Sequence, residues 1–363
     1  MFGRSERIIS RILGPQTYEA GISVLQLGRR DWNAPYALSD RLRAWRHGFF
    51  ADSYAVYNFP RNNPADYISD FVRIARCSQV NADLMYFEHK ITFRAFLLQA
   101  GLRQPDTLAL AAYGNCLLNP LSSDARYIDA AEFESTLKAD GGQFVVKPEA
   151  GCRGHGIFLL DARGGELFRR RGKERERFKV SDLPSIAIVE RRFEQHPFWG
   201  ALFPDTANSI RVLTGWAPGD RRPSSIRAVQ RIGNAATVPT DNWRGGGISA
   251  IVDLKTGRLG AGRAHPLKCA YADQRFEVHP DTGAQIQDTI LPYWDCILDT
   301  VMRACMSSPM HRYVGWDVLV DRNGEPVILE GNANSGVQVF QVHGGLLCEP
   351  AARRFYERCG VLK

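Results

Sequence analysis

Two apolar runs near the end of the 363-residue chain flank a turn-forming segment, and each run carries an acidic residue. They lie in VGWDVLVDRNGEPVILEGNANSG, residues 314–336. Asp317 lies within the first run, Glu330 closes the second, and Asn332 follows shortly after. Because Gly324 suits a tight turn, we expect the runs to pair as antiparallel strands with both carboxylates on one face. Asn332 shares that face if the strand continues.

Paired carboxylates within apolar runs require an explanation, because ionised groups are costly to bury. Like charges on neighbouring strands repel and raise each other's pKa unless a cation lies between them. An all-oxygen cluster suits Mg²⁺, which takes one or two protein carboxylates together with phosphates and waters. Asp317, Glu330 and Asn332 are therefore candidate magnesium ligands, and no His or Cys lies near enough in sequence to favour zinc. The alternative is a pair of polar residues on an edge strand.

The composition is that of a globular chain with room for two or three packed units: 44% of its residues are hydrophobic and 23% are charged. The first residues contain no apolar signal-peptide core, and no stretch approaches the length of a membrane span. The eight cysteines are scattered without a CxxC pair, which is typical of reduced thiols. We therefore expect a cytoplasmic protein with no membrane partner.

The net charge of +7 has two readings. It is either a solvated basic surface or a field that favours anionic ligands such as nucleotides, carboxylates and phosphorylated substrates. No familiar nucleic-acid-binding motif is present, so nucleic acid is not an expected partner.

The order of elements predicts an α+β fold. Residues 1–85 are expected to be mostly helical and loop, and apolar spacing predicts helices over 66–79 and over 88–101, the latter closed by Gly101. From about residue 140, short β-like runs alternate with turns, and helices are expected over 288–308 and 346–360. Strand runs with interspersed helices favour α+β sheets over one parallel sheet.

A dense charge run at 168–179, FRRRGKERERFK, leaves two interpretations open. The first is a solvated or mobile connector, because charged runs rarely pack. The second is a mobile basic lid over an anionic site.

A glycine-rich segment, FVVKPEAGCRGHGIFLL, joins two predicted strands. Glycines allow close backbone approach, so that successive N–H groups can surround a phosphate, and Lys147 at the end of the first strand adds a positive charge. The segment is neither a P-loop nor a Rossmann fingerprint, because a strand follows it rather than a helix. An ordinary turn remains the alternative. The glycines are Gly151, Gly154 and Gly156.

Arginines recur within the later strand runs. Arg211 lies between Ile210 and Val212, which should face the opposite side, while Arg227 and Arg231 should share one strand face. An arginine on such a face is a natural partner for carboxylate or phosphate, although each could equally be salt-bridged or exposed. TDNWRGGG follows, in which three glycines permit close approach of a ligand or form a flexible turn.

The order of these motifs resembles the ATP-grasp superfamily, and within it the sugar-transfer-associated family related to alpha-L-glutamate ligases. The resemblance covers roughly residues 80–345 and implies two α+β lobes that grip ATP, preceded by a variable N-terminal domain. It implies domains of 1–85, 86–187 and 188–363. The motifs that carry it are EHK, KPEAGCRGHG, IVE, SIRV, DNWRGGG, VGWD and LEGNA.

The resemblance also implies nucleotide-binding roles. Lys147 would bind the α- and β-phosphates, Lys90 would be the second nucleotide lysine, and the 151–156 loop would close over the phosphates. Within this loop Arg153 and His155 either contact phosphate or point outward. The adenine would be read largely through backbone groups of Ile188, Val189 and Glu190.

Further implied roles concern the metal and the reacting groups. Asp317, Glu330 and Asn332 would hold one or two Mg²⁺ ions. The γ-phosphate and the acyl phosphate would face Arg211, Arg231 and Asn242.

The implied activity is that of an ATP-dependent carboxylate–amine ligase with ATP and Mg²⁺. Its partners would be a small-molecule carboxylate and an amine, such as an amino acid, a peptide or a sugar-linked compound. The alternatives are an ATP-grasp kinase that phosphorylates a hydroxyl or a sugar, and a nucleotide-binding protein without turnover.

Overall fold

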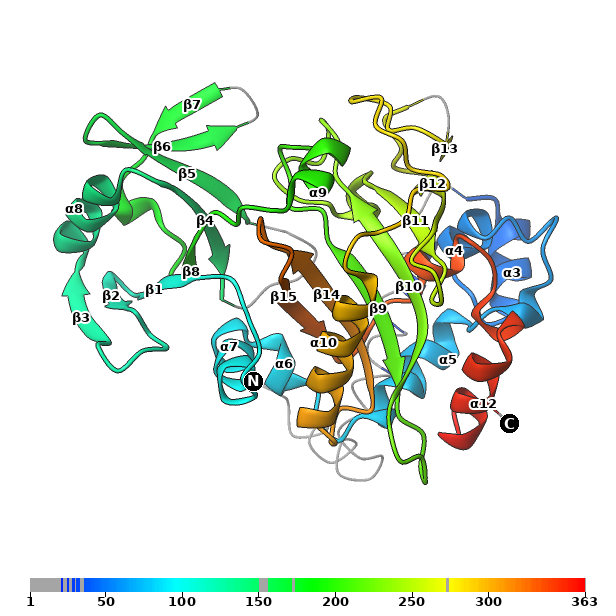
Figure 1. Cartoon of the computed structure of the whole chain (residues 1–363). Helices are drawn as coiled ribbons and strands as arrows, with labels where there is room; N and C mark the ends of the chain where they lie inside the picture. Colours follow the sequence, from blue (N-terminus) through cyan, green and yellow to red (C-terminus); the bar gives the residue numbers. More distant parts are fainter. Residues whose placement is uncertain are drawn as a thin grey trace.

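Two antiparallel sheets organise the chain, one on each side of Figure 1. The computed structural model describes residues 36–149, 156–171, 174–271 and 274–362, together with residues 21, 25, 28, 29, 31 and 32. Helices pack on both sheets, so the predicted α+β fold is confirmed.

In the described residues, eight strands form the first sheet, in the order β3-β2-β1-β8-β4-β5-β6-β7. We call this sheet with its helix α8 the N-lobe. Helix α8 begins where the Asp129 carboxylate accepts the backbone N–H of Glu132, and it ends at Gly141, whose φ of +66° suits glycine. The bounds are β1 Thr107–Ala112, β2 Asn115–Leu118, β3 Arg126–Asp129, α8 Ala130–Asp140, β4 Gln143–Pro148, β5 Phe158–Arg163, β6 Glu166–Arg171, β7 Glu174–Arg177, η3 Val180–Asp182 and β8 Ile186–Arg191.

The second sheet has seven described strands, in the order β13-β12-β11-β10-β9-β14-β15. We call this sheet with the helices on its faces the C-lobe. Its bounds are α9 Pro197–Leu202, β9 Ile210–Gly215, β10 Ser224–Ile232, η4 Trp243–Gly245, β11 Ile248–Val252, β12 Leu259–Ala264, β13 Arg275–Phe276, α10 Trp294–Ser307, β14 Tyr313–Val320, β15 Pro326–Asn332, α11 Gln338–Gln341, η5 Leu346–Cys348 and α12 Pro350–Arg358.

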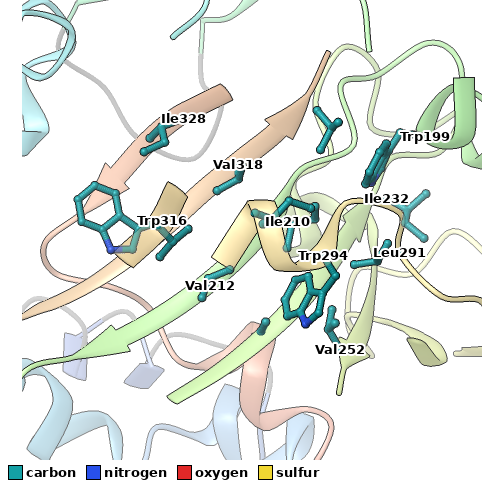
Figure 2. Close-up of a cluster of buried hydrophobic side chains, with 14 of the residues drawn as sticks. Trp199, Ile210, Val212, Ile232, Val252, Leu291, Trp294, Trp316, Val318 and Ile328 are labelled. Carbon is teal, nitrogen blue, oxygen red and sulfur yellow. The ribbon is translucent and has the colours of Figure 1, made fainter. Parts of the chain in front are cut away.

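One face of the C-lobe sheet packs against α10 and forms the largest core. Figure 2 shows Ile210 and Val212 of β9, Val318 of β14 and Ile328 of β15 gathered on this face. Ile210 and Val212 are fully buried here, as expected from their alternation with Arg211. The arginine is therefore placed on the opposite face.

Two short helices before the N-lobe belong to this same core. They are α6 (Met85–Glu88) and α7 (Lys90–Gln99), and their apolar side chains Phe87, Phe93 and Phe96 pack with Trp316 of β14. Gly101 closes α7 with a φ of +64°, as predicted. The apolar stripe of α7 thus joins the C-lobe, although residues 86–187 were expected to form the N-lobe.

The expected boundary at residue 187 also needs correction, because it falls inside β8. This strand pairs with β1 on one side and β4 on the other, so it lies in the middle of the N-lobe sheet. The N-lobe sheet therefore ends at Arg191. The sequence alone did not show which strands would pair with the segment IAIVER.

The opposite face of the C-lobe sheet carries the N-terminal helices together with the C-terminal ones. Buried residues of 44–77 share a core with Leu213 and Val229 of the sheet and with Phe340 and Tyr356. Gln341 fastens this contact, because its side chain bonds both the N–H and the carbonyl of Ile68. The helices are α3 Leu38–Arg46, α4 Ala51–Val56, η1 Pro64–Asp66, α5 Asp70–Ala75 and η2 Cys77–Val80.

In its described part the charge run at 168–179 forms two strands rather than a loose connector, and the lid interpretation stays a prediction. Phe168 to Arg171 lie in β6 and Glu174 to Arg177 in β7, and the two strands pair at the edge of the N-lobe sheet. The side chains of β7 are all exposed, which reconciles strand structure with a solvated composition. Charged edge strands also resist pairing with other chains.

No helix in the described part of the chain has the length and apolar character needed to cross a membrane. The thiols of Cys77, Cys116, Cys296, Cys305, Cys348 and Cys359 are free of disulfide bonds in the described part of the chain.

Candidate functional site

The carboxylates of the opening motif meet across two paired strands. In the antiparallel register of β14 and β15, Asp317 lies opposite Glu330 and Gly315 lies opposite Asn332. The next pair joins Val318 to Ile328, so one residue of β15 is extra at this point. Such a bulge bends a strand and re-aims its side chains. The predicted pairing of the two acidic strands is confirmed.

Asp317 is almost completely buried and is held by two arginines. Both oxygens accept from Arg211 at 2.6 Å, and Oδ2 also accepts from Arg231 at 2.9 Å. Burial opposes ionisation of Asp317, yet the two guanidinium groups hold its pKa below the ordinary value. The same pairing raises the pKa of Arg211 against the effect of its own burial. The carboxylate is thus fixed in its ionised form.

Asp241 extends this network beyond Arg231. Its Oδ1 accepts from Arg231 at 2.5 Å, and its Oδ2 accepts from the backbone N–H and the hydroxyl of Ser209. Asn242, next in sequence, caps the short helix η4 by accepting from the N–H of Arg244 at 3.1 Å. Asn242 therefore directly follows a member of the arginine network, and its side chain caps the turn after it.

Two of the three glycines after Asn242, namely Gly246 and Gly247, approach protein backbone closely. A Cβ on Gly246, whose φ is +110°, would lie 2.7 Å from the carbonyl oxygen of Lys268. A Cβ on Gly247 would lie 3.0 Å from that of Asp241. These glycines are needed for the fold of the loop that positions Asp241.

Lys90 reaches the same region from the start of α7. Its Nζ donates to the backbone carbonyl of Glu149 at 3.0 Å. The Glu149 side chain in turn accepts from the Ile91 N–H and contacts the His89 ring, so it caps α7. Burial lowers the pKa of Lys90, while attraction by Glu330 and Glu149 opposes that shift. Lys90 and Glu330 are thus electrostatic neighbours, as a shared site requires.

Lys147 forms a buried ion cluster with Glu190 and Arg94. Its Nζ lies 2.5 Å from Glu190 Oε2, while Arg94 donates through Nε and Nη2 to Glu190 Oε1 at 3.2 and 2.8 Å. Arg94 also donates to the carbonyl of Ile328 at 3.3 Å, which is on the strand that carries Glu330. Burial disfavours the carboxylate, yet Arg94 and Lys147 lower the pKa of Glu190 to about 2. This cluster joins the N-lobe to the C-lobe.

The expected adenine contacts do not fit the position of β8. Ile188 pairs with Leu110 and Lys147, and Val189 pairs with Ala109 and Val146. Since both strand edges are occupied, the backbone groups of Ile188 and Val189 serve the sheet, and the Glu190 side chain serves the ion cluster. The expectation that backbone groups of Ile188, Val189 and Glu190 bind adenine is therefore wrong. Sequence order could not show that both edges of the run would be filled.

Most of the glycine-rich loop lies outside the described residues, including Gly151, Arg153, Gly154 and His155. Its two flanking strands pair as a β4–β5 hairpin, as predicted. Gly156 follows the loop with a φ of +76°, and a Cβ there would lie 2.8 Å from Pro148 Cγ. Glycine is therefore required at this position by conformation and by space.

The oxygen donors of the motif suit a magnesium ion. Asn332 donates its amide N–H to the Gly315 carbonyl at 3.1 Å, which fixes the side chain and leaves its oxygen as the coordinating atom. In the described part of the chain, no three His, Cys, Asp or Glu side chains gather as a metal site. Two carboxylates and an amide fit an ion that completes its shell with phosphate and water.

Three functional candidates were missed from the sequence, namely Arg94, Glu149 and Asp241. Arg94 lies one helical turn after Lys90, so both side chains share a face of α7, which was the available signal. Glu149 directly follows the Lys147-Pro148 pair. Asp241 directly precedes Asn242, and nothing in the local sequence indicated which of the two would pair with an arginine.

The two sheets and the lysine, arginine and carboxylate groups between them define an ATP-grasp protein. More narrowly, the sequence matches the model of the sugar-transfer associated ATP-grasp family over residues 75–354, and the chain belongs to that family. No curated protein matches the sequence.

Solved structures of ligases and a synthetase match the chain at low sequence identity. The ATP-grasp ligase PsnB with precursor peptide PsnA2 and AMPPNP is 15% identical, with 76% of this chain and 61% of that chain covered and a TM-score of 0.39. The L-amino acid ligase from Bacillus licheniformis is 12% identical, with 74% and 43% covered and a TM-score of 0.36. D-alanyl-alanine synthetase A from Vibrio cholerae O1 biovar eltor str. N16961 is 9% identical, with 76% and 64% covered and a TM-score of 0.42. The chain thus spans less than two thirds of each of these structures.

Proposed function

We propose that the protein is an ATP-dependent carboxylate–amine ligase that works through an acyl phosphate. The observation that carries this proposal is the cross-strand pair Asp317–Glu330, flanked by Arg211 and Arg231 on one side and by Lys90 on the other. Anionic and cationic groups alternate within one partly buried cluster, and such an arrangement can bind a polyphosphate together with a carboxylate. Membership of the ATP-grasp family supports the same reading.

Each side chain then has a distinct task. Lys147 and Lys90 bind nucleotide phosphates, and Gly156 with the preceding loop residues Gly151, Arg153, Gly154 and His155 covers them. Asp317, Glu330 and Asn332 hold Mg²⁺, which neutralises charge on the β- and γ-phosphates when bound. The transferring phosphoryl group and the later oxyanion are stabilised by Arg211 and Arg231. We assign Asn242 to the same region.

The reaction proceeds in two displacements. An oxygen of the substrate carboxylate attacks the γ-phosphorus of ATP, the bond to ADP breaks, and an acyl phosphate forms. The amine nitrogen then attacks the acyl carbon, phosphate leaves, and the nitrogen loses a proton to solvent, which gives the amide. The side chains act by positioning and charge neutralisation, since phosphoryl transfer needs little covalent participation by protein.

A product assay tests the function directly. The purified protein is incubated with ATP, Mg²⁺ and pairwise combinations of carboxylates and amines, starting with amino acids and short peptides, and ADP and product mass are recorded. ADP that appears only when acid and amine are both present, with an adduct lighter than their sum by one water, supports the ligase. ADP formed with one hydroxyl compound and a product heavier by one phosphoryl group identifies a kinase instead.

We predict that Lys147→Ala weakens nucleotide binding about 10- to 100-fold. The reason is the loss of a charge-assisted contact to phosphate, which is worth on the order of 1.5–3 kcal/mol. Calorimetric titration with AMPPNP and Mg²⁺ gives the Kd of each protein. The matched control is Lys138→Ala, which removes a lysine paired with Glu134 within helix α8. Equal affinity of the Lys147 variant and the unchanged protein would exclude Lys147 from the nucleotide site.

A further inference from the structure

A row of polar side chains continues from the proposed catalytic arginines across the C-lobe sheet. Arg231 of β10 lies directly opposite Ser249 of β11, and Ser249 lies opposite Arg263 of β12. Arg263 in turn lies opposite Arg275 of β13. Since directly paired residues point to the same side of a sheet, all four side chains occupy the face that carries Asp317.

The last two arginines of this row have no acidic partner in the part of the chain that the structure describes. Arginines directly opposite each other on neighbouring strands repel and destabilise the sheet. Burial and the charge of Arg275 both lower the pKa of Arg263. Among the residues that the structure describes, the pair is therefore a positive site without a compensating acid.

The groups around Arg263 supply no negative charge. The Ser249 hydroxyl and His343 Nε2 lie 3.0 Å apart, and burial together with Arg263 and Arg227 lowers the pKa of His343 to about 3. The imidazole is therefore neutral at physiological pH. Burial likewise raises the pKa of Tyr67, which interacts electrostatically with Arg263. Neutral hydrogen-bonding groups thus lie beside Arg263, as in a site prepared for an anion.

Protection of a sheet edge accounts for only part of this arrangement. Charged side chains on edge strands prevent pairing with other chains, and Arg275 is an exposed residue of the edge strand β13. Arg263 lies on the inner strand β12 and is half-buried, so edge protection does not explain it. A bound anion explains both arginines.

We infer that Arg263 and Arg275 bind a second anionic group, a carboxylate or a phosphate, on the substrate whose reacting carboxyl lies at Arg231. This inference rests on the proposed ligase function for the identity of the reacting end. Neighbouring strands are about 4.8 Å apart, so the backbone of Arg263 lies about 10 Å from that of Arg231. The substrate class is therefore an elongated acid whose second anionic group is on the order of 10 Å from the reacting carboxyl, as in an acidic peptide or a phosphorylated acid.

Calorimetry with two probes tests the anion site without turnover. The protein is saturated with ADP and Mg²⁺, so that its phosphate site is filled, and is then titrated with glutarate or with inorganic phosphate. The variants are Arg263→Gln and Arg275→Gln, and Arg263→Lys keeps the charge but loses the bidentate fork. The matched control is Arg222→Gln, an exposed arginine in the turn between β9 and β10 that gives the same change of net charge.

We expect Arg263→Gln to raise the Kd of the tighter probe about 10- to 100-fold, with a smaller rise for Arg275→Gln and Arg263→Lys and none for Arg222→Gln. The probe that loses more affinity identifies the anion as carboxylate or phosphate. Equal affinities in Arg263→Gln and the unchanged protein overturn the inference, as does an equal loss in Arg222→Gln. If Arg263→Gln does not fold, Arg263→Lys and Arg275→Gln decide the matter by the same criteria.

The outcome is independent of the ligase assay. If the protein makes no amide but Arg263→Gln weakens probe binding, the anion site is supported and the proposed function is refuted. If the protein makes an amide and Arg263→Gln changes neither KM nor kcat, the proposed function is supported and the anion site is refuted. Where both hold, Arg263→Gln raises the KM for the acid substrate and leaves kcat nearly unchanged, because the second anion does not change during the reaction.

Discussion

Glu330→Gln is expected to lower Mg²⁺-dependent turnover by about 10²- to 10³-fold while the free energy of unfolding stays nearly unchanged. The carboxylate lies opposite Asp317 on the face that we assign to the metal, and no ion pair of Glu330 occurs within the described residues. Replacing it by an isosteric amide removes a charge that the metal needs, and it breaks no ion pair with the described residues, although it weakens the attraction between Glu330 and Lys90. ADP release as a function of Mg²⁺ concentration measures the first quantity, and urea denaturation measures the second.

Asp317→Asn should lower turnover similarly but should also destabilise the protein, by about 3–5 kcal/mol. Here the lost charge leaves Arg211 and Arg231 in a buried environment without their shared partner. The control for both variants is Asp299→Asn, an exposed position on α10, which should match the unchanged protein in both assays. Wild-type turnover in Glu330→Gln would remove the metal assignment, and unchanged stability in Asp317→Asn would contradict the described ion network.

Arg94→Met should destabilise the protein by about 3–5 kcal/mol, because it breaks a buried ion cluster from one side. The guanidinium is only 2% exposed, and its removal leaves Glu190 with Lys147 alone and the Ile328 carbonyl without this donor. Urea denaturation at neutral pH gives the difference. The control, Arg43→Met, removes an arginine that is 68% exposed in α3 and should change stability by no more than about 0.5 kcal/mol. A loss of the same small size for Arg94→Met would show that the cluster does not stabilise the fold.

The pH dependence of stability reports on the same cluster. The pKa of Glu190 is about 2 in the folded chain, below its ordinary value of 4.5. A depressed carboxyl pKa contributes stability that is fully present above pH 4.5 and is lost as pH falls towards 2. In Arg94→Met the pKa should rise, because burial then acts against only one cation. Stability measured across this pH window should therefore fall less steeply with acid in the variant, and an identical slope would contradict the role of Arg94.

The features that could be predicted from the sequence depend on short-range regularities. The Asp317–Glu330 pair was predicted from a tight turn and from the alternation of side chains along a strand. The placement of Arg211 on the sheet face opposite Ile210 and Val212 was predicted from the same alternation. The glycine-flanked hairpin of β4 and β5 was predictable for the same reason. Such patterns determine their own local geometry, so one sequence suffices to read them.

The features that could not be predicted depend on which distant segments become neighbours. Ile188 and Val189 looked available for a ligand until β1 and β4 filled both edges of β8. Glu190 met Arg94 across a large sequence separation, and only the packing of α7 on the C-lobe explains that contact. The charge run at 168–179 became a hairpin because a neighbouring strand was available to pair with it. Tertiary context decided each of these cases.

Arg94 also determines where the two lobes can separate. One guanidinium holds the Glu190 carboxylate of the N-lobe and the Ile328 carbonyl of the C-lobe, so the distance between β8 and β15 is fixed at that point. A movement of one lobe against the other that keeps both contacts would displace each residue in proportion to its distance from Arg94. Strand β7 lies four strands from β8 in the N-lobe sheet and would move most, whereas Lys147 contacts Glu190 directly and would move least.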